Sequence, residues 1–171
     1  MFLHDVWPDS DEFFVPEKNL HSAVFEVMCD AIRDEAQRVG IKGVGIVLAW
    51  RPGIRYFSSL SVIVGSIEGE PIRKSGSHVI GINHFAVANS MVSEMLLTLQ
   101  PSGTNPRRLI RRGETGLRGG QIYSVESWEA YLLVAFSGGT PDENVQIATA
   151  GAENTRLRHF GIERVTIVKP R

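Results

Sequence analysis

The chain has 171 residues, close to the usual size of one domain, and 43% of them are hydrophobic, which is enough for a sizeable core. The formal net charge of −1 argues against a strongly basic nucleic-acid-binding protein. The longest apolar run, residues 44–50, is far shorter than the roughly 20 residues of a membrane helix, and the N-terminus lacks the pattern of a secretory signal. We therefore expect a cytoplasmic protein that contacts neither membranes nor nucleic acids.

The N-terminal forty residues are predicted to form an arm and a helix. Residues 1–16 have no sustained hydrophobic period, so we expect an irregular arm that packs on its own domain or on a neighbouring subunit. Residues 17–39 repeat apolar side chains at helical spacing, with Asn19 as the expected N-cap and Gly40 as the stop. The lone cysteine, Cys29, excludes a disulfide framework and a multi-cysteine metal site, and we expect it to be a buried, inert thiol.

The middle of the chain is predicted to contain a hairpin, a helix and a long loop. Residues 41–50 and 54–67 are rich in β-branched and aromatic residues on either side of a turn at residues 51–53, which favours an antiparallel hairpin. Residues 79–99 show helical spacing again. Residues 101–119 are rich in glycine, proline and arginine and are expected to form a loop.

The C-terminal part repeats this order. Residues 120–126 and 129–137 are predicted to form a second hairpin, and residues 141–160 a third helix. A capping box at residues 140–143 marks its start, because Thr-Pro-Asp-Glu places threonine at the N-cap and glutamate at the third helical position. Residues 163–168 are expected to add one short strand.

Hairpins separated by helices indicate an α+β domain with a mainly antiparallel sheet, which we expect to span residues 17–171. Its charge is unevenly distributed. Residues 1–40 contain nine acidic residues against three basic ones, whereas residues 107–118 contain five arginines against one glutamate. This separation suggests either an anion site or a head-to-tail contact between subunits.

Two histidines lie at the expected start of the second helix. His78 and His84 are six residues apart, so they do not share a helix face, and a two-histidine metal site made by this pair is not expected. The simplest interpretation places them on the helix surface. The functional alternative makes one of them an axial ligand of a heme or a proton-transfer group.

The loop carries two pairs of arginines around an apolar centre made by Leu109 and Ile110. A solvated loop, or one that faces the acidic helix of another subunit, is the simpler interpretation. The alternative is a clamp for an amphiphilic carboxylate or phosphate, because guanidinium groups pair bidentately with planar anions. The arginines concerned are Arg107, Arg108, Arg111 and Arg112.

Two glycine pairs, Gly119-Gly120 and Gly138-Gly139, lack the context of a phosphate-binding loop. The second pair precedes a helix N-terminus, so its amides could bind an anion, although a tight strand-to-helix turn explains it equally well. Ser137 has no nucleophile-elbow context and is not expected to be a nucleophile.

Residues 131–151, with the sequence YLLVAFSGGTPDENVQIATAG, resemble the C-terminal signature of the GlcG/HbpS-like heme-binding family, which includes the C-terminal domain of PduO-type adenosyltransferases. The strand at residues 43–49 and the opening of a hairpin by Gly119-Gly120 match the same layout. The resemblance implies a profilin-like α/β/α sandwich with a five-stranded antiparallel sheet, assembly into dimers or larger rings, and binding of heme or another small ligand. It assigns no axial heme ligand in this chain.

Two functions are therefore expected. The first is a ligand-binding protein, a homo-oligomer that holds heme or another amphiphilic anion. The second is an enzyme acting on a small organic acid, with a histidine as general acid or base and arginines binding the carboxylate. The candidate ligand-binding residues are His78, His84, Arg107, Arg108, Arg111, Arg112, Gly119 and Gly120.

Overall fold

The computed structural model describes residues 15–53, 57–68, 72–73, 79–105, 109–126, 129–154, 157–158 and 165–167. The arm expected at residues 1–16 lies outside this part of the chain except for its last two residues, which begin the first helix.

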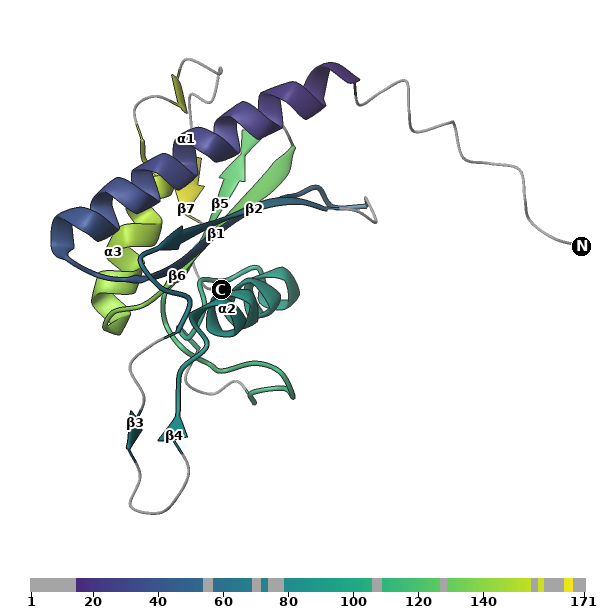
Figure 1. Cartoon of the computed structure of the whole chain (residues 1–171). Helices are drawn as coiled ribbons and strands as arrows, with labels where there is room; N and C mark the ends of the chain where they lie inside the picture. Colours follow the sequence, from purple (N-terminus) through teal and green to yellow (C-terminus); the bar gives the residue numbers. More distant parts are fainter. Residues whose placement is uncertain are drawn as a thin grey trace, which may run out of the picture.

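An antiparallel sheet forms the centre of the molecule, which confirms the α+β class (Figure 1). Four strands of six to eight residues lie in the order β2-β1-β6-β5, and each pairs antiparallel with its neighbour. The three-residue strand β7 (Val165–Ile167) pairs with the outer side of β5. The long strands are β1 (Gly43–Trp50), β2 (Phe57–Val64), β5 (Gly120–Val125) and β6 (Ala130–Ser137).

Helices cover both faces of the sheet. Helices α1 (Val15–Val39) and α3 (Pro141–Ala152) pack on one face, and α2 (His84–Thr98) packs on the other. Strand β1 is therefore buried on both sides, with Val47 toward α1 and Ile46 toward α2, which explains its continuous apolar sequence. The Cys29 thiol lies in the α1 core, so the expectation that it is buried is confirmed, and burial raises its pKa to about 12, which disfavours the reactive thiolate.

Three helix boundaries differ from those predicted. Helix α1 begins at Val15, because Pro16 is compatible with a first helical turn, and Asn19 therefore lies inside the helix. Helix α2 begins at His84 rather than at residue 79, because the Asn83 side chain caps it by accepting from the Ala86 N–H. Helix α3 ends at Ala152, ahead of a separate turn.

Residues 79–80, expected in the second helix, instead form strand β4 (Val79–Ile80), which pairs with β3 (Ile72–Arg73). The Gly40 stop is confirmed by its φ of +77° and by the bond from the Ile41 N–H to the Ala36 carbonyl.

The capping box at the start of α3 is confirmed. The Glu143 N–H donates to Thr140 Oγ, and the Thr140 N–H donates to the Glu143 carboxylate at 2.8 Å. Thr140→Ala is expected to lower the free energy of unfolding by ~1 kcal/mol, because one helix N–H loses its partner. Urea unfolding measures this loss. Ligand affinity should stay unchanged, and a tenfold loss of affinity in a variant as stable as wild type would assign the turn to the binding site.

Candidate functional site

His84 is the predicted site residue that the structure places in a distinctive environment. It is the first residue of α2, it is only 8% exposed, and its backbone N–H donates to the Ile67 carbonyl at 2.9 Å. Its Nδ1 lies 3.1 Å from Oγ of Ser137, the last residue of β6. Ser137 is also buried, with 4% of its surface exposed. A polar contact thus joins the start of α2 to the end of the sheet.

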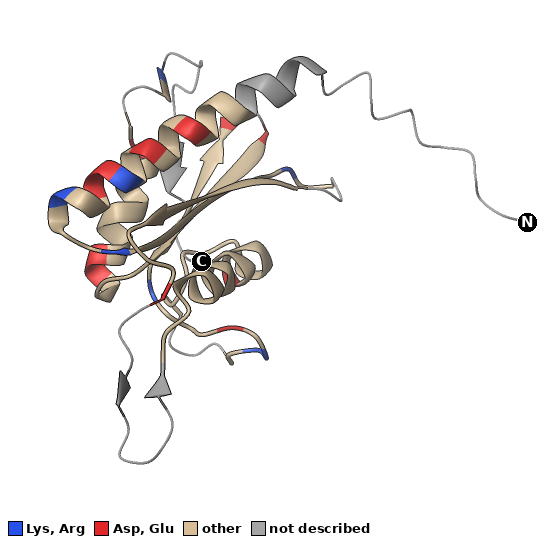
Figure 2. Cartoon of the chain, viewed as in Figure 1, with Lys and Arg blue, Asp and Glu red and all other residues tan. Residues whose placement is uncertain are grey.

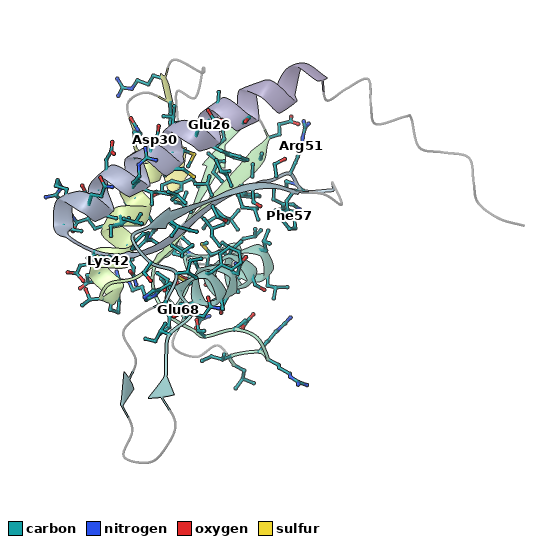
Figure 3. The ribbon with its side chains drawn as sticks, viewed as in Figure 1. Glu26, Asp30, Lys42, Arg51, Phe57 and Glu68 are labelled. Carbon is teal, nitrogen blue, oxygen red and sulfur yellow. The ribbon has the colours of Figure 1, made fainter. Side chains whose placement is uncertain are left out.

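Close backbone contacts fix the position of Ser137. A Cβ on Gly43 would lie 2.0 Å from the Ser137 carbonyl oxygen, and a Cβ on Gly138 would lie 2.2 Å from the Lys42 carbonyl oxygen. Glycine is therefore required at both positions for β1 and β6 to approach this closely. Figure 3 shows Lys42 and Glu68 at this same end of the sheet, and Glu68 forms a bridge with Asn83, next to His84.

Burial keeps the His84 imidazole neutral. Desolvation lowers the pKa of His84 below its usual 6.5, so the ring carries one proton at pH 7. With that proton on Nδ1, donated to Ser137 Oγ, Nε2 presents a lone pair suited to a metal ion or a proton. The described residues contain no group of three or more metal-ligating side chains, so this nitrogen would act as a single ligand.

Three exposed apolar residues lie close to His84, two of them in the sequence and one in the segment that follows β2. Ile82 lies two positions before His84 and Phe85 directly after it, and the Ile67 carbonyl accepts from the His84 N–H. We call His84 and these three apolar residues the His84 surface. Figure 2 shows that charged residues are sparse along α2, whereas they are frequent on α1. The His84 surface therefore suits an apolar or amphiphilic molecule more than a small hydrophilic one.

The turn between β6 and α3 is structural. The Gly139 N–H donates to Asn144 Oδ1 at 2.9 Å, and the Thr140 N–H donates to the Glu143 carboxylate. Both amides already have partners within the chain, and the acidic side chains of Asp142 and Glu143 disfavour an anion at this helix end. The structure therefore favours a tight turn over an anion site at Gly138-Gly139.

Gly119 and Gly120 lie in the packing beneath α2. The Gly120 N–H donates to Ser102 Oγ at 2.8 Å, and a Cβ on Gly120 would lie 2.7 Å from Cε of Met95. A Cβ on Gly119 would lie 2.7 Å from the Phe136 carbonyl oxygen. These close contacts give the pair a packing role, separate from the His84 surface.

His78, Arg107 and Arg108 lie outside the described residues, so only the second half of the arginine loop can be placed. Arg111 and Arg112 are exposed beside Leu109 and Ile110, which are 88% and 60% exposed. The Thr115 N–H donates to Ser90 Oγ at 2.6 Å, which anchors the loop to α2 six residues, or about 9 Å, after His84. The loop and His84 therefore belong to the same side of the sheet.

Ser137, which was not expected to be a nucleophile, is a member of this site. Its partner His84 lies 53 positions earlier in the chain, and only the packing of α2 across the sheet brings them together. The sequence signal for Ser137 is its position between an apolar strand and two glycines, because glycines at a strand end allow close contact with a neighbouring strand.

The chain was compared with models of protein families, with curated proteins and with solved structures, and no comparison gave a significant match. Among the described residues, no helix is long and apolar enough to cross a membrane.

Proposed function

We propose that this chain is a ligand-binding protein of the GlcG/HbpS-like type with a profilin-like α/β/α sandwich. Three features support the assignment: the Ser-Gly-Gly-Thr turn between β6 and α3, the confirmed capping box, and helices on both faces of an antiparallel sheet. The sheet order β2-β1-β6-β5-β7, in which β7 has three residues, is compatible with that fold.

We propose further that the ligand is an amphiphilic anion, with heme as the first candidate, held at the His84 surface. The observation that carries this proposal is a buried imidazole at the start of α2, where exposed Phe85 follows it in the chain and exposed Ile67 accepts a hydrogen bond from its backbone N–H. The donor chemistry fits heme, since heme iron takes a neutral imidazole nitrogen as its axial ligand and the porphyrin needs an apolar surface. Bound heme would supply an iron centre for redox or ligand chemistry. His84 would hold the iron, and Arg111 or Arg112 would face the propionates.

The 3.1 Å contact between His84 and Ser137 favours a second candidate function. A neutral histidine beside a hydroxyl group can move a proton, so an enzyme acting on a small organic acid could use His84 as general acid or base. In that case the arginines would hold the substrate carboxylate, and small dicarboxylates would bind more tightly than hemin.

The two functions are separated by titrating wild type and arginine variants with hemin and with small dicarboxylates. Wild type should give a Soret shift that saturates near one hemin per chain. At least one of Arg111→Ala and Arg112→Ala should weaken hemin binding roughly tenfold or more, because a charge-assisted hydrogen bond contributes ~1.5–3 kcal/mol.

Arg38→Ala is the matched control, because Arg38 is exposed and lies on α1, on the opposite face of the sheet. It should bind hemin as wild type does. Absence of a saturable Soret shift would overturn heme binding, and tight binding of a dicarboxylate alone would favour the enzyme. Equal hemin affinity of Arg111→Ala, Arg112→Ala and wild type would remove these two arginines from the site.

A further inference from the structure

Strand β2 forms an edge of the sheet and lacks the features that usually prevent an edge strand from pairing with another strand. Among the described residues it pairs only with β1. Its eight residues, FSSLSVIV, include no charged residue, proline or glycine, and they pair with β1 without a bulge. Edge strands that stay unpaired commonly carry charges, prolines or bulges that block a further strand. The outer N–H and C=O groups of β2 are therefore open to a second strand.

One face of β2 is also bare. The register with β1 places Phe57, Ser59, Ser61 and Ile63 opposite Trp50, Leu48, Ile46 and Val44, on the α2 side of the sheet. Helix α2 packs over β1, β6 and β5, so it leaves this side of β2 uncovered. Phe57 and Ile63 are accordingly 57% and 52% exposed. The opposite face of β2 is packed against α1 through Val62 and Val64.

The flank of α2 away from the loop is also uncharged. The loop bonds to α2 through Ser90 and Glu94, with the Gly103 N–H donating to Glu94 Oε1 at 3.0 Å. At 100° per residue, Phe85 stands about 180° from Glu94, on the flank that the loop does not cover. Glu94 is the only charged residue in α2 and is buried, so the exposed part of this helix carries no charge.

We propose that β2 pairs antiparallel with β2 of a second copy of this chain, across a twofold axis perpendicular to the sheet at Leu60. A twofold axis in this direction places the α2 faces of the two copies on the same side of the joined sheet. Because the axis passes through Leu60, Phe57 lies opposite Ile63 of the second copy and Ser59 opposite Ser61. An aromatic residue opposite a β-branched residue is a favourable cross-strand pair. The alternative register centred on Ser61 leaves Phe57 without such a partner.

The same register continues an aromatic row that already crosses the sheet. Tyr131 and Trp50 stack with ring centroids 6.0 Å apart, and Phe57 lies opposite Trp50 on β2. Pairing of the two β2 strands extends this row to Ile63 of the second copy. The partner is a second copy because the strand is self-complementary and uncharged, as expected for an interface in which the same patch meets itself.

A disulfide cross-link tests the register. In Leu60→Cys the two new cysteines lie directly opposite each other, where Cα atoms are about 4.5–5.5 Å apart and a disulfide is allowed. In the control Ser58→Cys, on the same face, the equivalent cysteines lie four residues apart along the strands, about 13 Å. Copper(II)–phenanthroline as oxidant should convert Leu60→Cys, but not Ser58→Cys, into a covalent dimer. Equal cross-linking of both variants, or none of Leu60→Cys, would overturn the register.

Sedimentation equilibrium tests the dimer itself. Ser59→Lys with Ser61→Lys brings like charges opposite each other across the axis, so the dissociation constant should rise at least tenfold. The control, Ser22→Lys with Gln37→Lys, adds the same charge at exposed positions of α1 and should leave the dimer unchanged. A monomeric wild type would overturn the proposal. Dissociation of the control alone would instead assign the contact to the acidic face of α1.

Discussion

His84→Ala is expected to weaken hemin binding by roughly 100-fold, which equals the upper end of the loss caused by removing a hydrogen-bond partner of a metal-bound histidine. The reason is that Nε2 of His84 is the proposed iron ligand, so the variant loses the coordinate bond itself. The measurement is a Soret titration of the folded variant. Iron-free protoporphyrin should bind wild type and His84→Ala equally, because it has no iron to coordinate.

Ser137→Ala is the graded control for this prediction. It keeps the imidazole but removes the hydroxyl group 3.1 Å from Nδ1, so the ring loses the partner that orients it. We expect a loss of about tenfold in hemin affinity, at the lower end of such effects. An unchanged Soret position and affinity in His84→Ala would show that this residue is not the ligand.

The pH dependence of binding follows from the burial of His84. Because desolvation lowers the pKa of His84 in the folded state, the imidazole stays neutral somewhat below pH 6.5, and hemin coordination should persist to a lower pH than for an exposed histidine. The stability effect has a definite sign. The unfolded chain takes up this proton near pH 6.5 and the folded chain only at lower pH, so the free energy of unfolding falls as pH decreases through that interval.

Much of the fold could be predicted because its signals are local. Hydrophobic period, the Gly40 stop and the Thr140 capping box each depend on residues within a few positions of one another, and the structure confirms the elements they predict. The errors are also physical. Residues 79–83 continue the apolar pattern of α2, but the Asn83 cap starts the helix at His84, and residues 79–80 pair as a strand.

The site was harder to predict because its contacts cross the fold. His84 was a candidate on its residue type alone, whereas its burial and its contact with Ser137 depend on how α2 packs over β1, β6 and β5. The bare face of β2 had no sequence signal either, since an apolar strand with interspersed serines is equally compatible with a central position. Register and helix placement decide that β2 is an edge.

Gly43→Ala is expected to lower the free energy of unfolding by more than about 3 kcal/mol, or to prevent folding, because overpacking against backbone exceeds the usual cost of an added methyl group. The added Cβ would lie 2.0 Å from the Ser137 carbonyl oxygen and 2.8 Å from Cα of Gly138, and neither atom belongs to a side chain that can rotate away. Gly40→Ala is the matched control. It also adds one methyl group, at a φ of +77° with no atom within 4 Å, so it should cost only about 1–2 kcal/mol of backbone strain.

Urea unfolding of both variants measures the difference, and equal stability of Gly43→Ala and wild type would contradict the close contact between β1 and β6. The contact also links the fold to the site. Any relaxation that accommodates the Gly43 methyl group must move the end of β6, which carries Ser137. If Gly43→Ala folds, its hemin affinity should therefore fall toward that of Ser137→Ala, whereas Gly40→Ala should bind as wild type does. A destabilised Gly43→Ala with wild-type hemin affinity would mean that Ser137 does not orient His84.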